Sequence, residues 1–230
     1  MKKDYVNKIF HNIANKYDLM NDIMSFGIHR KWKKKFIKHI DLKKKDIKLL
    51  DLGCGTGDIV SEIDTSNKFS NYISYLVDPN INMIKEGQKK IKKKKNKWIN
   101  AYGENLPFKN NSFDLITMSF SLRNVSNLKK TLSEINRVLK VSGQFLCLEF
   151  GKIDNLAINS IYKIYSENII PEIGEKITGK KYAYEYLVDS IKKFPSQEEL
   201  VKILKSKKFK FVNFHNLTFG VVAIYSCKKK

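Results

Sequence analysis

The sequence predicts an α/β protein whose core is a seven-stranded, mostly parallel sheet with helices on both faces. Two observations support this prediction. Apolar runs of strand length alternate with amphipathic helical segments through the middle of the chain, as in repeated βαβ units with right-handed crossovers. One run ends in Asp51 and passes into a turn containing Gly53, Gly55 and Gly57, directly before a helix. This pattern is typical of a buried parallel strand that delivers its carboxyl end to a ligand.

The glycine-rich turn favours a positively charged ligand. A dinucleotide-binding turn follows G-x-G-x-x-G and places a pyrophosphate on the helix N-terminus. Here the third glycine comes one position early, and Asp58, where that motif expects glycine, would repel a pyrophosphate. Acids before and after the glycines suit an amino-acid ammonium beside a sulfonium. The alternative interpretation is a tight turn that binds no ligand. Three alternating glycines between a strand and a helix argue against it.

The N-terminal residues 1–46 are expected to form a helical lid. Apolar residues at helical spacing predict a helix over 4–15, and a second helix is expected from His29 to His39. The segment 17–27 between them is predicted to be irregular, because it is polar and lacks a clear period. Lids of this kind often cover the strand ends of α/β domains.

The strands after the glycine turn place polar residues at the ligand edge. Asp78 ends the second strand, where a carboxylate can accept hydrogen bonds from both ribose hydroxyls of a nucleoside. Tyr102 and Gly103 follow the third strand, Ser119 lies at the end of the fourth, and residues 121–125 lie just beyond it. The strands are expected at 72–78, 98–102, 113–120 and 143–150, and helices at 79–91 and 128–139.

The last third of the chain predicts an insertion followed by a hairpin. Residues 152–193 are helical in pattern and rich in tyrosine, which makes them a candidate substrate cover. A helix over 196–206 begins with Ser196 and Glu199 in capping-box spacing. Two final strands, 209–213 and 221–227, are close enough in sequence to pair antiparallel.

Length and composition favour one domain, residues 1–230, in a reducing compartment. The apolar fraction of 42% argues against disorder, and no repeat or Gly/Ser linker marks a boundary. The three cysteines are far apart and support neither a disulfide framework nor a metal site. No signal peptide follows Met1, and the longest apolar run near the end is about half a membrane span. We expect a cytoplasmic protein that can associate with the inner face of a membrane.

The formal charge of +21 bears on the class of partner. All but three of the 44 basic residues are lysine, spread along the chain with a run at 89–97. Base-edge recognition favours the planar fork of arginine. We therefore favour a solvated lysine surface over attraction to anionic lipid, and both over RNA binding.

Several phrases match one family. The strand ends resemble those of class I S-adenosylmethionine-dependent methyltransferases, and nearly the whole chain resembles the ubiquinone/menaquinone biosynthesis C-methyltransferase family. The most specific matches are YDLMN at 17–21, SFGIHR at 25–30 and LRNV at 122–125, while GTGD at 55–58 and LPF at 106–108 are less specific. All three arginines lie in matching phrases.

Three positions depart from the family pattern. Ser121 replaces a glycine, Val141-Ser142 replaces Pro-Gly, and Tyr102 replaces a polar residue. The last change leaves the backbone of Tyr102 and Gly103 as the adenine contact.

The resemblance implies methyl transfer from S-adenosylmethionine to a ring carbon of a polyprenyl quinol. The residues expected to hold the cofactor are Asp51, Gly53, Gly55, Thr56, Asp78, Tyr102, Gly103 and Ser119. Arg123 and Asn124 are expected to bind and polarise the quinol oxygen. Because arginine stays protonated, proton removal needs water or a second group such as Tyr17, His29 or Glu149.

The resemblance also leaves other partners and functions open. A homodimer or a complex of quinone-biosynthesis proteins is one expectation. An RNA methyltransferase on the same fold is an alternative that the charge suggests, although no aromatic-interleaved arginine patch accompanies it. A second alternative is a lipid- or partner-binding module that has lost turnover.

Overall fold

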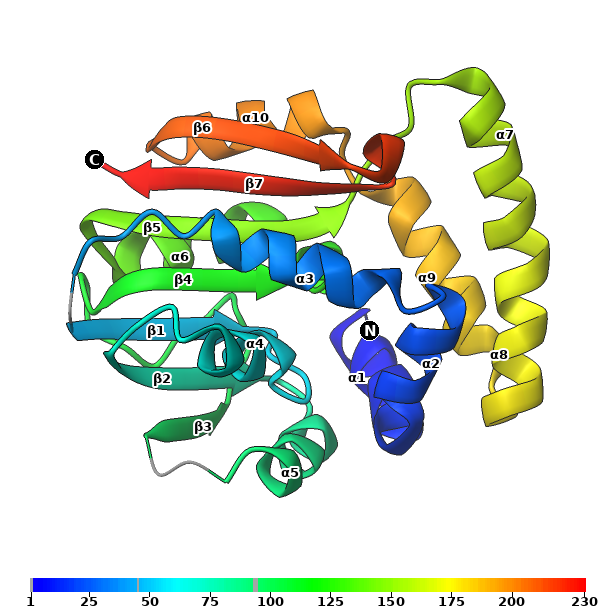
Figure 1. Ribbon diagram of the computed structural model, residues 1–230, viewed down its shortest axis with the longest axis horizontal. Coiled ribbons are helices and arrows are strands. Elements are labelled where there is room, and N and C mark those ends of the chain that lie inside the picture. Colours follow the sequence, from blue (N-terminus) through cyan, green and yellow to red (C-terminus); the bar gives the residue numbers. More distant parts are fainter. Residues whose placement is uncertain (1, 45, 93–94) are drawn as a thin grey trace.

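The computed structural model describes residues 2–44, 46–92 and 95–230, and within them seven strands form one mixed sheet (Figure 1). The strand order is β3-β2-β1-β4-β5-β7-β6, in which β7 pairs antiparallel with β5 and β6 and all other pairs are parallel. This confirms the predicted sheet and its C-terminal hairpin. The strands are β1 (Asp46–Leu52), β2 (Asn71–Asp78), β3 (Asn96–Asn100), β4 (Phe113–Ser119), β5 (Leu139–Phe150), β6 (Phe209–Leu217) and β7 (Val222–Lys229).

Helices cover both faces of the sheet, as predicted. Because side chains alternate along a strand, Leu50 and Leu52 of β1 pack with α6 and α10, whereas Ile47 and Leu49 pack with α3 and α4. Ser196 and Glu199 form the predicted capping box at the start of α10. The helices are α1 (Lys2–Ile13), α2 (Tyr17–Met24), α3 (Ile28–Lys38), α4 (Asp58–Ser66), α5 (Ile81–Lys90), α6 (Leu128–Val138), α7 (Leu156–Ile164), α8 (Ile170–Thr178), α9 (Lys181–Lys193) and α10 (Gln197–Ser206).

A third, smaller apolar cluster joins the N-terminal helices to the helical insertion at residues 152–193. Ile9 and Met20 from the N-terminal helices pack with Ile170, Ala183 and Tyr184 from the insertion. In Figure 1, α1, α2 and α7–α9 lie together beyond the carboxyl ends of β1, β4 and β5. The predicted lid and the predicted insertion therefore meet over the edge of the sheet where α/β proteins bind ligands.

The prediction of irregular structure over 17–27 was wrong, because residues 17–24 form α2. Its buried Met20 packs in the third cluster, while Asp18 and Asp22 bond to side chains of other elements. Those polar side chains hide the helical period in the sequence. Part of the lysine run at 89–97, residues 93 and 94, lies outside the described residues.

Candidate active site

Two cavities lie side by side at the carboxyl edge of the sheet. The larger has a volume of about 250 Å³ and the smaller of about 100 Å³. They share a wall made by residues of α2, the glycine-rich turn and the end of β4, namely Tyr17, Gly53, Gly55, Ser119 and Phe120. A single elongated ligand can therefore occupy the smaller cavity and present one end to the larger.

The smaller cavity contains the carboxylate predicted at the tip of β2. Asp78 is 8% exposed, and its Oδ2 accepts a hydrogen bond from the Gly55 backbone N–H at 2.9 Å. Its Oδ1 accepts from Asn80 N–H at 2.8 Å. Burial raises the pKa of Asp78 to about 6, against the opposing effect of these two bonds. The structure thus brings Asp78 and the glycine-rich turn together, as the sequence predicted.

The remaining residues of the smaller cavity include three that the sequence singled out. Tyr102, Gly103 and Asn124 line it, together with Asn80. Asn80 was missed, although its position before a helix is an N-cap signal. Its side chain accepts from Asn82 N–H and Met83 N–H at the start of α5 and donates to Asn7 of α1. Asn80 therefore connects the lid to this cavity.

The glycine-rich turn requires glycine on steric grounds. Gly53 has φ +66°, and a Cβ there would lie 2.5 Å from the Ser121 side chain. Gly57 has φ +84°, and a Cβ there would lie 2.6 Å from Ile91. Both the backbone conformation and the lack of space thus exclude larger residues at these two positions.

Asp51 and Ser119, which line the larger cavity, each carry a buried polar atom to which no described residue bonds. Asp51 is 1% exposed, and its Oδ1 accepts from the Thr117 hydroxyl at 2.8 Å. Among the described residues, nothing bonds to Asp51 Oδ2 or to Ser119 Oγ. Burial raises the pKa of Asp51 to about 7, and the nearby Asp58 and Asp78 add to the rise. An unpaired buried carboxylate fits the ammonium end of an amino acid, because that cation would stabilise its charged form.

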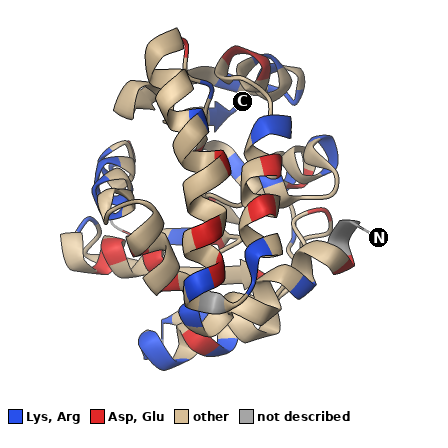
Figure 2. Ribbon diagram, turned by 90° about the vertical axis from the view of Figure 1, so that its right-hand side faces the viewer, with Lys and Arg blue, Asp and Glu red and all other residues tan. Residues whose placement is uncertain are grey.

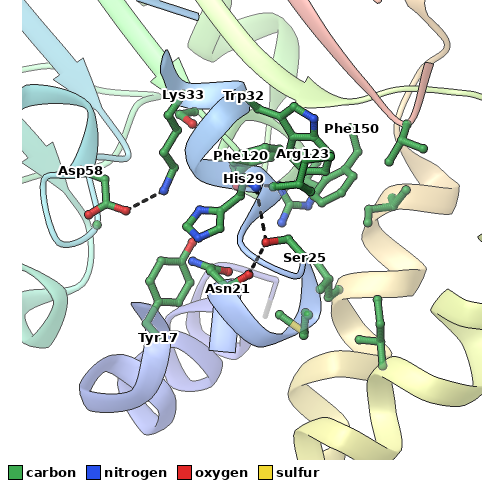
Figure 3. Close-up of a pocket in the computed structure, with 18 of the residues that line it drawn as sticks. Tyr17, Asn21, Ser25, His29, Trp32, Lys33, Asp58, Phe120, Arg123 and Phe150 are labelled. Carbon is green, nitrogen blue, oxygen red and sulfur yellow. Dashed lines mark hydrogen bonds and ion pairs between the residues drawn. The ribbon is translucent and has the colours of Figure 1, made fainter. Parts of the chain in front are cut away.

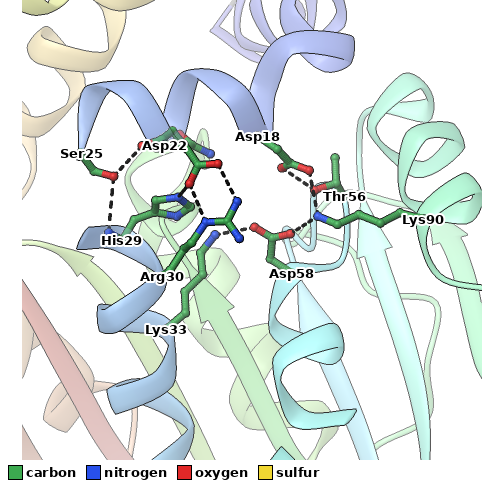
Figure 4. A network of polar contacts seen from close by, with 10 residues as sticks. Asp18, Asp22, Ser25, His29, Arg30, Lys33, Thr56, Asp58 and Lys90 are labelled. Atoms are coloured by element: carbon green, nitrogen blue, oxygen red, sulfur yellow. Dashed lines mark hydrogen bonds and ion pairs between the residues drawn. The ribbon is translucent and has the colours of Figure 1, made fainter. Parts of the chain in front are cut away.

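The lid is tied to the glycine-rich turn by a polar network (Figure 4). The hydroxyl of Thr56, an expected cofactor contact, donates to Asp18 of α2 at 2.9 Å. Lys90 of α5 pairs with Asp18 at 2.8 Å and also with Asp58. Lys33 of α3 pairs with Asp58 at 2.6 Å, and both line the larger cavity.

Arg123 lines the larger cavity and holds a buried ion pair (Figure 3). It lies in the 3-10 turn Leu122–Asn124 after β4, and its Nη1 donates to Glu149 Oε1 at 2.8 Å. Its Nε donates to Ser190 at 3.3 Å, and its guanidinium lies 5.0 Å from the Phe150 ring centroid. Asn124 instead lines the smaller cavity and accepts from the Tyr186 hydroxyl at 3.2 Å. The two neighbours thus face different cavities.

Three aromatic rings form an apolar wall of the larger cavity. Trp32, Phe120 and Phe150 line it, with ring centroids 6.1 Å apart for the first pair and 5.0 Å for the second. Phe120 has φ +53°, an unfavourable backbone region for a large residue. Its amide donates to Leu148 and its carbonyl accepts from Arg123, which holds this conformation. The wall suits a flat ring.

The three candidate bases differ in their surroundings. Burial raises the pKa of the Tyr17 hydroxyl, which disfavours the phenolate. Glu149 is fully buried and bonded to Arg123, and it is not among the residues that line the cavity. His29 lines the larger cavity at 6% exposure, and its Nε2 lies 2.8 Å from Asp22 Oδ1. Neither Asp22 nor Lys33 was given a role from the sequence: Lys33 only follows Trp32 in a family-matching pair, and Asp22 lies between the matching phrases 17–21 and 25–30.

Among residues 2–44, 46–92 and 95–230, no cluster of three or more His, Cys, Asp and Glu side chains could hold a metal ion. Within the same described part of the chain, no helix is both long and apolar enough to cross a bilayer.

Comparisons with known proteins agree with this geometry. The model of the ubiE/COQ5 methyltransferase family matches residues 1–229. The ubiquinone/menaquinone biosynthesis C-methyltransferase UbiE of Rickettsia bellii (strain RML369-C) is 45% identical over 234 residues, covering 99% of this chain and 94% of the relative. The same-named protein of Rickettsia felis is also 45% identical, over the same shares of the two chains.

Solved structures show the same fold at low identity. A possible histamine N-methyltransferase of Thermotoga maritima has a TM-score of 0.68 at 18% identity and covers 98% of this chain and 100% of its own. A Haemonchus contortus phosphoethanolamine N-methyltransferase in complex with S-adenosylmethionine has a TM-score of 0.63 at 14% identity, covering 86% and 52%. The chain therefore belongs to the ubiE/COQ5 methyltransferase family, with the class I fold and S-adenosylmethionine as its cofactor.

Proposed function

We propose that this enzyme methylates a ring carbon of a polyprenyl benzoquinol or demethylmenaquinol in ubiquinone/menaquinone biosynthesis. The observation that carries the proposal is the pair of adjoining cavities. The smaller one presents the Asp78 carboxylate to a nucleoside, and the larger one presents an aromatic wall beside Arg123. The family match and the names of the relatives support the same reaction class.

The residues of the glycine-rich edge fit S-adenosylmethionine. Asp78 would accept from the ribose hydroxyls, the backbone of Tyr102 and Gly103 would contact adenine, and Asp51 with Ser119 would hold the amino-acid end. The bound cofactor supplies a methyl group activated by a sulfonium. Gly53 and Gly55 allow the backbone to approach it closely.

The residues of the larger cavity prepare the ring for attack. The wall of Trp32, Phe120 and Phe150 would hold the ring flat and exclude water, which strengthens the electrostatic interactions inside. Arg123 would stabilise negative charge on a ring oxygen, because a nearby cation lowers the pKa of a phenol. Because the guanidinium stays protonated, we expect Arg123, held by Glu149, to orient the oxygen and stabilise its charge without removing its proton.

The insertion supports binding at a membrane surface, where a polyprenyl tail resides. No residue of α7 is buried, and its Leu156, Ile161 and Ile164 are 81%, 69% and 61% exposed. Tyr162 of the same helix lines the larger cavity. α7 forms the outer edge of the molecule in Figure 1, and Figure 2 shows the charged residues of this side spread over several helices. We infer that α7 contacts lipid while the quinol head enters the cavity.

Transfer of a labelled methyl group tests the proposal. Purified protein is incubated with methyl-labelled S-adenosylmethionine and either extracted polyprenyl quinols or total RNA. Label in the quinol fraction is the expected result. Label in RNA would replace the proposal with RNA methylation, and no label in either, with the cofactor bound, would indicate a binding module.

A further inference from the structure

We infer that His29 is the catalytic residue that takes the proton from the quinol hydroxyl, and that Asp22 is its positioning residue. The inference rests on the proposed function, since it names the base for that reaction. Three features of the lid carry it: the fixed orientation of the imidazole, its unpaired ring nitrogen, and its place in the larger cavity.

The orientation of the imidazole is fixed by a chain of bonds from α3 to α2 (Figure 4). His29 Nε2 lies 2.8 Å from Asp22 Oδ1. Arg30 donates to both oxygens of the same carboxylate, from Nε and Nη2, at 2.6 Å each. These bonds hold the pKa of Asp22 well below its usual range, so the carboxylate stays charged. A charged carboxylate only accepts, so Nε2 carries the proton and donates it to Asp22.

This tautomer leaves Nδ1 as an acceptor. Nδ1 is buried, and among the described residues no group bonds to it. A buried acceptor without a partner is costly unless a ligand or water completes it. His29 lines the larger cavity together with Arg123 and the aromatic wall, and Figure 3 shows the Tyr17 hydroxyl pointing toward the imidazole. A ring hydroxyl bound in that cavity is a suitable donor to Nδ1.

The surroundings keep the imidazole neutral, so that it is free to accept a proton. Burial and the Lys33 ammonium on α3 lower the pKa of His29, while Asp22 on α2 and Asp58 on α4 act in the opposite direction. Arg30 also lies on α3, and the Tyr17 hydroxyl and the Arg123 guanidinium face the same cavity. A neutral histidine at physiological pH can accept a proton, and the Asp22 carboxylate then stabilises the imidazolium.

Protons and electrons balance in the proposed methyl transfer. The hydroxyl proton moves to Nδ1, and the ring carbon beside the resulting oxyanion supplies an electron pair to the methyl carbon. The carbon–sulfur bond breaks, and its electron pair stays on sulfur. The methylated carbon then loses its hydrogen to water while the imidazolium returns its proton to the ring oxygen. One proton is released in total, and His29 ends neutral.

Replacement of His29 tests the inference against a matched histidine. We expect His29→Gln to lower kcat by about 10²- to 10⁴-fold, the usual contribution of a general base, and to leave cofactor affinity in calorimetry within about twofold. His215→Gln, at an exposed histidine of β6, should leave both unchanged. If His29→Gln keeps kcat within about threefold, or loses cofactor affinity in parallel with kcat, His29 is not the base.

Asp22→Asn provides a second test that retains the histidine. Nitrogen-15 NMR of the ligand-free protein should show His29 protonated at Nε2 only, with its pKa falling in the variant because the imidazolium loses its carboxylate. The acid limb of the kcat profile should move to lower pH by the same amount. An Nδ1-protonated tautomer, or an unchanged pKa in Asp22→Asn, would overturn the inference. Because NMR needs no substrate, this outcome is distinct from a wild-type protein that fails to methylate quinols.

Discussion

Arg123 Nη1 lies 2.8 Å from Glu149 Oε1, and the two side chains are 6% and 0% exposed. Glu149 Oε2 also accepts from the Arg123 backbone N–H at 3.2 Å. The carboxylate thus fixes both the side chain and the backbone of the residue expected to meet the substrate oxygen. The pair joins the turn after β4 to the end of the neighbouring strand β5.

Breaking this pair should cost stability as well as activity. Arg123→Ala leaves Glu149 charged and buried without its cation, so we expect a loss of about 3–5 kcal/mol in the free energy of unfolding. Adding Glu149→Gln should restore a large part of it, because the buried charge is gone. Urea unfolding of both variants measures this. Equal stabilities of the single and double variants would contradict the prediction. Arg123→Lys, which keeps a cation, is the better variant for measuring turnover.

Cofactor binding should strengthen as the pH rises from about 6 to about 8. The Asp51 pKa is raised to about 7, so part of the ligand-free protein carries a proton there at neutral pH. A cation binds the charged form, so binding releases protons, and affinity grows as the pH rises through that pKa. Calorimetry in two buffers of different ionisation enthalpy measures the release. Asp51→Asn should reduce it, whereas Asp41→Asn, at an exposed aspartate, should not.

Asp78 should contribute to cofactor affinity far more than to folding. We expect Asp78→Ala to raise the Kd of S-adenosylmethionine by about 10- to 150-fold for each ribose hydrogen bond lost, the range for bonds to a charged acceptor. Thermal unfolding of the ligand-free variant should change little by comparison, because burial already disfavours the Asp78 charge. The control is Asp46→Asn, at the start of β1, which is the end of that strand away from the glycine-rich turn. Unchanged calorimetric affinity would remove Asp78 from the cofactor site.

Lys90 should hold the lid closed. Its ammonium bonds to Asp18 on the lid and to Asp58 beside the glycine-rich turn. Partly exposed pairs contribute about 0.2–1 kcal/mol each, so Lys90→Ala should raise the cofactor Kd by about 2- to 30-fold and speed hydrogen exchange in α1 and α2. The neighbouring Lys89 pairs with Glu86 on its own helix, and Lys89→Ala should do neither. High salt should shrink the difference between the two variants.

The apolar surface of α7 should drive binding to lipid. We expect replacement of Leu156, Ile161 and Ile164 by Ser to lower binding to vesicles of phosphatidylcholine and phosphatidylglycerol at least tenfold, because each side chain loses about 1.5–3 kcal/mol of burial. The matched control replaces Val141 of β5 and Phe211 of β6, which are also exposed but do not belong to α7. Sedimentation with vesicles measures both. Equal losses in the two variants would indicate non-specific adsorption.

Local patterns predicted the sheet and the cofactor edge because they are set by short-range rules. A strand that ends in Asp51, followed by alternating glycines and a helix, leaves few other conformations. The next parallel strand must then place its last residue, Asp78, beside that turn. The structure places Asp78 within hydrogen-bond distance of Gly55 N–H for this reason.

The residues that sequence reasoning missed depend on contacts between distant segments. The Lys33–Asp58 pair forms only when the lid packs on α4, and the polar side chains of α2 hid a helix whose period is visible once Met20 is seen to be buried. The Arg123–Glu149 pair could have been predicted from the sequence. Both residues follow or end predicted strands, and β4 and β5 are neighbours in this fold, so their side chains had to meet.

Tyr17, the first residue of α2, borders both cavities. The preceding α1 contributes Asn7 and Phe10 to the smaller cavity, and the rest of α2 contributes Asn21 and Met24 to the larger. One continuous stretch of chain, α1 and α2, thus covers both cavities. We expect any opening of this stretch to uncover both cavities at once, which would couple release of the methylated ring to exchange of the cofactor.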